Sequence, residues 1–150
     1  MNKIVYNKNL FNKFVELIEN EEYFKSTIHS IASNQIIFRS QYKYLDEIIA
    51  FGSLDENVFL NYVIQEAFHK LINSVREFEK FLSGHFHPVT SHRDDEEMYS
   101  WIDKKQGESL LMSDYRERAE EMAKNLGEHE DRINDEYREF RMNVTENLYV

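Results

Sequence analysis

The chain contains no cysteine, and glycine and proline are scarce, with 4 and 1 among 150 residues. Without cysteine, it forms no disulfide bond, no thiolate metal site and no cysteine nucleophile. An all-β fold or a disordered linker would need many more glycines and prolines for its turns and irregular stretches. These absences fit a reducing compartment and favour a fold built from long helices.

Long hydrophobic runs are absent as well. No apolar run approaches the roughly 18 residues that a membrane-spanning helix needs. Residues 1–14 mix Asn and Lys with apolar residues and lack the core of a signal peptide. We therefore expect a soluble, cytoplasmic protein. Aromatic residues, by contrast, are plentiful, with 11 Phe, 9 Tyr and 1 Trp, and they can build the core of one domain spanning residues 1–150.

Hydrophobic residues recur at alternating steps of three and four in three long segments. The first stripe comprises Phe24, Ile28, Ile31, Gln35, Phe38, Tyr42, Leu45 and Ile49. The second comprises Ile64, Phe68, Leu71, Val75, Phe78 and Leu82. The third comprises Tyr115, Ala119, Met122, Leu126, His129, Ile133, Tyr137, Phe140, Val144 and Leu148, with small slips. This spacing places one apolar stripe on each of three helices, so that each helix packs against a neighbour.

Helix-start and helix-stop residues divide the chain into five predicted helices, three long and two short. They cover residues 9–20, 22–51, 53–83 and 91–106, and a segment that begins between residues 108 and 113 and runs almost to the C-terminus. Gly52 and Gly84 act as stops, and Ser53 with Glu56 forms a capping box. Short connections make neighbouring long helices antiparallel. We therefore predict an all-α fold, an elongated antiparallel helical bundle.

Two polar residues interrupt the hydrophobic stripes, namely Gln35 and His129. A polar residue at such a position usually fixes the register of neighbouring helices through a hydrogen bond. We interpret both as register residues, and the alternative for His129 is a catalytic or pH-responsive histidine.

Three histidines and a run of acids lie between residues 85 and 97. His85, His87 and His92 have the pattern His-x-His-x4-His, and Asp94, Asp95, Glu96 and Glu97 follow them. Neutral imidazoles with a carboxylate are suitable ligands for zinc or a similar ion. The acids also suit the first turn of the predicted helix at 91–106, where negative charge favours the helix dipole. Both interpretations stay open, and the default prediction is that no cofactor is present.

Negative charge is concentrated in the last third of the chain. The formal net charge is −10, and residues 93–150 hold 17 acids against 9 bases, a local charge of −8. A field of this sign disfavours nucleic acid and anionic membranes and favours a basic protein partner. The alternative is that these acids only form a solvent-exposed helix face. Two pairs, Glu120–Lys124 and Glu128–Arg132, have the i,i+4 spacing of ion pairs within such a helix.

The predicted partner-binding surface combines these acids with nearby aromatic residues, which would anchor the contact. It comprises Asp94, Asp95, Glu96, Glu97, Tyr99, Trp101, Glu117, Glu121, Glu128, Asp131 and Asp135. The alternative interpretation of Trp101 is that it is a core residue of the predicted helix at 91–106. No phosphate-binding loop or Ser-His-Asp order is present, so the sequence does not favour an enzyme.

In size and acidic composition, the chain is similar to immunity proteins of nuclease toxins and to phage-encoded inhibitors of nucleic-acid enzymes. This similarity implies a small acidic module that docks on a basic protein and inhibits it. One alternative is a metal-dependent or histidine-using enzyme centred on residues 85–97. Another is a structural protein whose hydrophobic stripes drive self-association into a homo-oligomer.

Overall fold

The computed structural model describes residues 2–89, 96–102 and 112–150, which form five helices and a small three-stranded sheet. The helices are α1 (Lys3–Ile18), α2 (Glu21–Asn34), α3 (Arg39–Ser53), α4 (Tyr62–His85) and α6 (Met112–Leu148). The all-α helical bundle that the hydrophobic stripes predict is confirmed.

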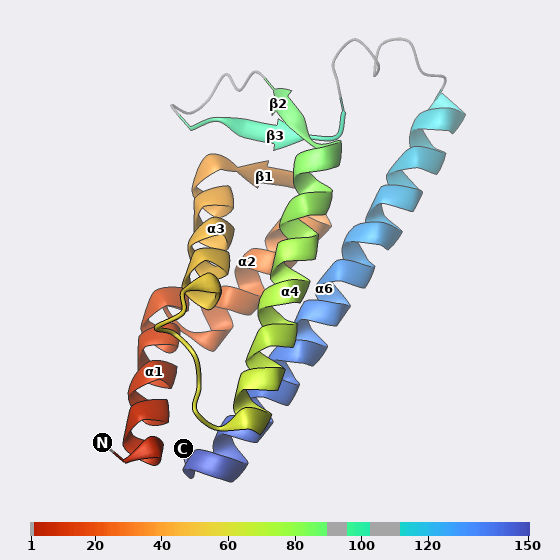
Figure 1. The fold of residues 1–150 in the computed structure, drawn as a ribbon. Coiled ribbons are helices and arrows are strands. Elements are labelled where there is room, and N and C mark those ends of the chain that lie inside the picture. The colour runs from red at the N-terminus through yellow and green to blue at the C-terminus, as the bar shows by residue number, and fades with distance from the viewer. Residues whose placement is uncertain (1, 90–95, 103–111) are drawn as a thin grey trace.

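The two longest helices, α4 and α6, run antiparallel along the length of the bundle (Figure 1). Helix α4 is central, because it packs against α6 on one side and α3 on the other. Helix α2 packs against α6, and α1 packs against α2, α3 and α6. The sheet lies at the end of the bundle where α4 finishes, and residues 2–5 and 146–150 lie at the opposite end (Figure 1).

Asparagine side chains begin three of the helices. The Oδ1 atoms of Asn2, Asn20 and Asn61 accept hydrogen bonds of 2.7–3.1 Å from backbone amides two or three residues later. These bonds satisfy amide groups that have no partner within the helix. Two predicted boundaries are therefore wrong: α1 begins at residue 3 rather than 9, and α4 begins at residue 62 rather than 53.

The segment between α3 and α4 is irregular because its side chains are used for tertiary contacts. Phe59 is buried, and its ring lies 5.2 Å from that of Phe68 and 5.7 Å from that of Phe140. Ser53 is the last residue of α3, where its hydroxyl donates to the Ile49 carbonyl, so the predicted capping box does not form. Burial of one aromatic ring outweighs the local helix-start signal here.

The predicted helix at residues 22–51 is broken at Gln35, between α2 and α3. Gln35 has the left-handed backbone conformation, with φ 55° and ψ 34°, and its backbone N–H donates to the Ile31 carbonyl. Strand β1 (Ile36–Phe38) follows directly. The heptad spacing continues across this break, so the pattern of apolar residues alone does not reveal it.

Two further strands pair with β1 in an antiparallel sheet of order β1-β3-β2. They are β2 (His87–Val89) and β3 (Met98–Ser100). In the register, Ile37 and Pro88 both lie opposite Tyr99. The prediction of a helix at 91–106 is wrong for residues 98–100, and residues 90–95 and 103–111 lie outside the described chain.

Aromatic rings form much of the hydrophobic core in the half of the bundle that contains α1. Phe140 of α6 is fully buried, and its ring centroid lies 5.3–6.0 Å from those of Phe11, Phe14, Phe59 and Phe68. The edge-to-face geometry of two of these pairs, with Phe14 and Phe59, is an arrangement that aromatic quadrupoles prefer. This cluster ties α1, α4, α6 and the segment before α4 into one core.

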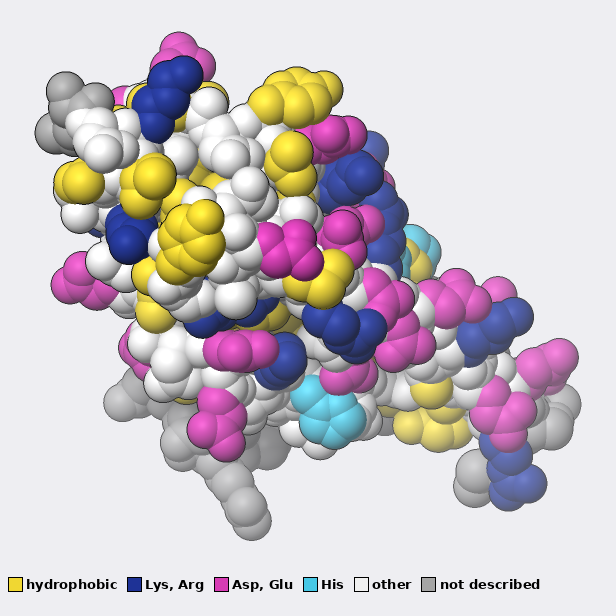
Figure 2. All heavy atoms as spheres, turned by 90° about the horizontal axis from the view of Figure 1, so that it is seen from below, with side chains coloured by type: hydrophobic (Ala, Val, Ile, Leu, Met, Phe, Trp, Pro, Cys, Tyr) yellow, Lys and Arg dark blue, Asp and Glu magenta, His cyan; other side chains and the backbone are white. Residues whose placement is uncertain are grey.

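At the same end of the molecule, large hydrophobic side chains are exposed (Figure 2). Of the twelve such side chains in the described chain, ten belong to three segments at residues 4–5, 54–63 and 142–150. We call these ten side chains the apolar end: Ile4, Val5, Leu54, Val58, Leu60, Tyr62, Val63, Met142, Tyr149 and Val150. In the part of the chain that the structure describes, no helix is long and apolar enough to cross a membrane.

Candidate docking surfaces

Five of the predicted partner-binding acids share one exposed stripe of α6. We call this the acidic stripe: Glu117, Glu121, Glu128, Asp131 and Asp135. Their spacing of 4, 7, 3 and 4 residues keeps them on one side of the helix, opposite the buried stripe that includes Met122, Leu126 and Ile133. At a rise of 1.5 Å per residue, the acidic stripe extends over about 27 Å.

On α6, acidic side chains outnumber the lysine and arginine side chains that could form ion pairs with them. From Asp114 to Glu139 the helix holds ten carboxylates and five lysine or arginine residues, a net charge of −5. Within the described residues, the ion pairs of these carboxylates are Asp135–Arg138 at 3.4 Å and Glu130–His29 at 2.8 Å. The predicted pairs Glu120–Lys124 and Glu128–Arg132 do not form. The acidic stripe therefore presents charge that is mostly not neutralised by its own helix.

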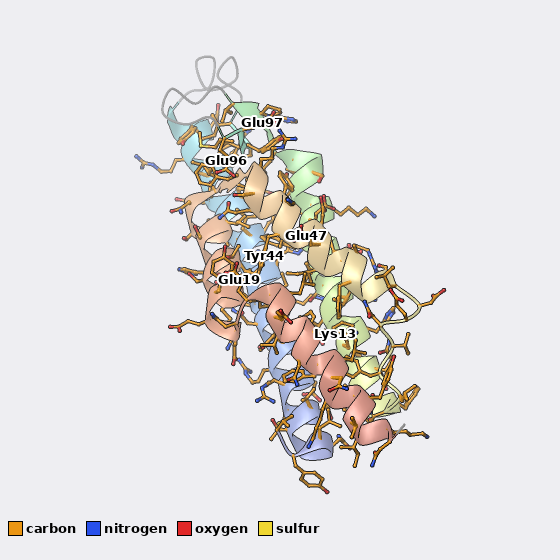
Figure 3. The ribbon with its side chains drawn as sticks, turned by 90° about the vertical axis from the view of Figure 1, so that its left-hand side faces the viewer. Lys13, Glu19, Tyr44, Glu47, Glu96 and Glu97 are labelled. Atoms are coloured by element: carbon orange, nitrogen blue, oxygen red, sulfur yellow. The ribbon has the colours of Figure 1, made fainter. Side chains whose placement is uncertain are left out.

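Glu96 and Glu97 lie on a different side of the molecule, beside α3 (Figure 3). The Glu96 carboxylate accepts a hydrogen bond of 2.7 Å from the backbone amide of Ser40, in the first turn of α3. Hydrogen bonds from Ser40 hold the pKa of Glu96 below its ordinary value. The Glu97 carbonyl accepts from the Arg39 amide at 2.9 Å. These two residues thus cap α3, in addition to any contact with a partner.

The predicted aromatic anchors pack against the protein itself. Tyr99 is half-buried, and its ring meets that of Tyr42 edge to face at 5.0 Å. Trp101 is also half-buried, and its Nε1–H donates to the Gln35 side-chain oxygen at 2.7 Å. Its ring stacks on that of Tyr115 in α6 at 5.8 Å. Neither residue is helical, contrary to the prediction of a helix at 91–106, and both hold the sheet against the bundle.

The predicted partner-binding residues that the structure describes come from three parts of the fold. The five acids of the acidic stripe lie together on α6, and Glu96 and Glu97 lie beside α3 (Figure 3). Tyr99 contacts Tyr42 of α3, and Trp101 contacts Tyr115 of α6. Asp94 and Asp95 lie outside the described residues. Sequence reasoning located the stripe because a single helix carries it, but it had no means of placing a strand relative to that helix.

A groove beside α3 is a surface that the sequence analysis missed. It is lined by Arg39, Ser40, Tyr42, Lys43, Asp46, Glu47, Ala50, Glu96 and Glu97. Partial burial, and then the nearby Glu79, raise the pKa of the Asp46 carboxyl above its ordinary value. The two cations and four carboxylates of the lining leave a net charge of −2. The lining residues that belong to α3 could be recognised in the sequence from their helical spacing. That Glu96 and Glu97 complete the lining depends on the fold, because they come from a distant segment.

Two of the three histidines of the predicted metal site, His85 and His87, lie within the described residues. His85 ends α4, where its Nδ1 lies 2.9 Å from the Phe81 carbonyl and its ring stacks on the Phe81 ring. His87 is exposed in β2, and His92 lies outside the described residues. Among the residues that are described, no group of three His, Asp or Glu side chains could hold one metal ion.

The two polar residues of the hydrophobic stripes differ in their surroundings. Gln35 links three elements, because its side chain accepts from Trp101 and donates to the Ala119 carbonyl of α6 at 3.2 Å. His129 packs against the rings of Phe78 and Phe81 at 5.7 and 5.0 Å. Partial burial, and then the charge of Arg132, lower the pKa of His129 below its ordinary value. A neutral imidazole between two phenyl rings suits packing better than proton transfer.

Comparison with known protein families, with curated proteins and with solved structures finds no match to this chain.

Proposed function

We propose that this protein is a binding module that docks on a basic protein partner and inhibits it by covering its cationic surface. The observation that carries the proposal is the acidic stripe of α6. Its five carboxylates are exposed along about 27 Å of one helix. Among the described residues, only Asp135 of the five has an ion-pair partner. A basic partner would supply the missing positive charge.

The composition of the stripe predicts how such a complex would behave. It contains no aromatic residue, and Tyr99 and Trp101 are occupied by contacts within the protein. Attraction between opposite charges speeds encounter and selects the partner, and salt screens it over about 10 Å at 0.1 M. We therefore expect rapid association whose affinity falls steeply as the salt concentration rises.

Neutralising the stripe tests this mechanism without changing side-chain size. In one variant, Glu117, Glu121 and Glu128 are replaced by Gln. A matched control replaces three exposed glutamates on other helices, Glu16, Glu47 and Glu66, by Gln, which gives the same net charge. Each chain is then used to capture proteins from cells that produce it, at low and at high salt, followed by quantitative mass spectrometry.

We expect the wild-type chain and the control to capture the same basic protein at low salt and to lose it at high salt. The stripe variant should capture much less of it at any salt concentration. An equal loss in both variants would mean that net charge, and not the stripe, attracts the partner. Capture of a neutral protein that survives high salt would contradict the proposed mechanism.

A further inference from the structure

The break between α2 and α3 lies at the middle of a hydrophobic stripe that suits one uninterrupted helix. The stripe runs from Phe24 to Ile49 in alternating steps of four and three residues, and it continues through Gln35 and Phe38, where the helix is interrupted. No glycine or proline lies between residues 21 and 51. These two residue types are the usual local causes of a helix break, so the cause of this one is not local.

The backbone at the break is held in a conformation that few residues other than glycine adopt. Gln35 is left-handed, with φ 55°, and such a residue persists only where its surroundings determine its conformation. Its side chain accepts from Trp101 and donates to the Ala119 carbonyl. Strand β1, which follows, has three residues and lies at the edge of the sheet, with β3 as its neighbour. A strand this short depends on its partner for stability.

The contacts that stabilise the break come from residues 96–101, which include β3. Beyond β1, the Glu97 carbonyl accepts from the Arg39 amide at 2.9 Å, and the Glu96 carboxylate accepts from the Ser40 amide at 2.7 Å. In an uninterrupted helix these two amides would donate to the carbonyl groups four residues earlier. The segment at 96–101 therefore replaces hydrogen bonds that the interrupted helix has lost.

A single chain cannot straighten this helix and keep its core. Tyr23 of α2 and Tyr44 of α3 meet edge to face, with ring centroids 5.4 Å apart. Twenty-one residues of continuous helix would separate them by about 32 Å. Straightening would also remove Phe24 of α2 from Tyr137 of α6, whose ring lies 5.4 Å away. Two copies can straighten the helix together, because α1 and α2 of each can take the same places on the other.

We infer that two copies of this chain exchange α1 and α2 to form a domain-swapped dimer, in which residues 21–53 of each copy are one continuous helix. The buried contacts of the exchanged helices, such as that of Phe24 with Tyr137, are then made with the other copy. Monomer and dimer differ mainly at the hinge, so its preference for helix decides between them, together with the chain concentration. The exchange does not depend on a basic partner, because the acidic stripe lies on α6, outside the exchanged helices.

Two substitutions at Gln35 shift the hinge in opposite directions. Gln35→Ala favours the continuous helix, because alanine has the highest helix propensity and disfavours the left-handed region. Gln35→Gly favours the break, because glycine adopts the left-handed conformation without strain and weakens a helix. Both variants lose the side-chain bonds to Trp101 and Ala119. A difference between them therefore reports the backbone preference and not the loss of these bonds.

Sedimentation velocity after refolding from urea measures the exchange. Each chain is refolded at micromolar and at millimolar concentration, because α1 and α2 must leave their own bundle before they can join another. We expect the wild-type chain to form dimer at the higher concentration. The dimerisation constant of Gln35→Ala should exceed that of Gln35→Gly by at least about tenfold, since each dimer contains two hinges. A wild-type chain that stays monomeric, or equal dimerisation of the two variants, would overturn the inference.

A distance within one chain separates an exchanged dimer from one joined by surfaces. The chain has no cysteine, so Glu22→Cys and Glu47→Cys place two spin labels at exposed positions of α2 and α3. Labelled chains are refolded with an excess of unlabelled chains, and pulsed electron paramagnetic resonance is recorded on the isolated dimer and monomer. The distance should lengthen in the dimer to about 37 Å, the rise of 25 helical residues. A dimer that keeps the shorter distance of the monomer would contradict the exchange.

Discussion

The two ends of the bundle are held together by different interactions. At the end that contains α1, aromatic rings from α1, α4 and the segment before α4 surround Phe140, which is fully buried. At the end that contains the sheet, side-chain hydrogen bonds join elements that are far apart in sequence. Gln35 bonds to Trp101, 66 residues away, and to Ala119, 84 residues away.

This difference has consequences for stability at each end. Burial of apolar area contributes free energy in proportion to the area, so the aromatic end should dominate the stability of the fold. A hydrogen bond contributes only about 1 kcal/mol net, because water competes for the same groups. We therefore expect the sheet end to open locally at a lower free energy than the aromatic end. The following substitutions test this comparison, from the largest expected effect to the smallest.

Phe140→Ala should be the most damaging single change at the aromatic end. It removes the ring that packs against Phe11, Phe14, Phe59 and Phe68, and it leaves a cavity among them. Such truncations cost about 3–5 kcal/mol of unfolding free energy. Urea unfolding measures the loss. Met142→Ala, two residues away but exposed, is the control and should change stability by less than about 0.5 kcal/mol.

Gly52→Ala should destabilise the contact between α3 and α4. A Cβ atom added at Gly52 would meet three carbon atoms of the Ile72 side chain, which is itself buried. Overpacking of this kind costs about 1–3 kcal/mol. Gly127→Ala makes the same change in α6, where nothing lies within 4 Å of the new methyl group, and should stabilise the protein by up to about 1 kcal/mol. Thermal unfolding of both variants should show shifts of opposite sign.

Trp101→Phe should weaken the sheet end. It keeps an aromatic ring but removes the Nε1–H that donates to Gln35, at a cost of about 1 kcal/mol. Hydrogen exchange should show faster opening of β1 and β3 with little change in α1. Adding Gln35→Leu to this variant should cost less than the same change in the wild-type chain, because the two residues share one bond. Strictly additive effects would mean that the bond contributes nothing.

His129→Gln should remove the part of the pH dependence of stability that comes from this residue. Burial lowers the pKa of His129 in the folded chain below the ordinary value of 6.5, so the unfolded chain binds the proton more readily. Stability from this residue is therefore complete above pH 6.5 and is lost as the pH falls through that value. The wild-type chain should lose more unfolding free energy than the variant between about pH 8 and pH 5. Equal losses of unfolding free energy in the two chains would show that His129 does not contribute to this pH dependence.

The helical fold could be predicted well from the sequence because its signals are local. The stripe from Ile64 to Leu82 predicts α4, and the stripe from Tyr115 to Leu148 predicts α6, almost to their true ends. The break at Gln35 could not be found in this way, since the heptad spacing of apolar residues continues through it. Its left-handed backbone is accompanied by bonds to Trp101 and Ala119, and the sequence does not show that these three residues meet.

The same limit applies to the surfaces: a surface carried by one helix could be predicted from the sequence, and a surface built from several segments could not. The acidic stripe follows from one helix and its periodicity, and its five acids are exposed together as the spacing requires. The groove beside α3 and the apolar end combine segments that are distant in the chain. Within the apolar end, Val58 lies in the irregular segment before α4 and Val63 lies in the first turn of α4, and both side chains are exposed.

The sequence by itself determined that this protein is an all-α bundle, which residues form the buried stripes of α4 and α6, and where its negative charge lies. These properties depend on spacing within a helix and on composition, which neighbouring residues fix. Only the tertiary structure decided that residues 98–100 form a strand, that Tyr99 and Trp101 pack against the bundle, and that three separate segments build the apolar end. These properties depend on hydrogen bonds and packing between distant residues, whose free energy outweighs the local preference of a short segment.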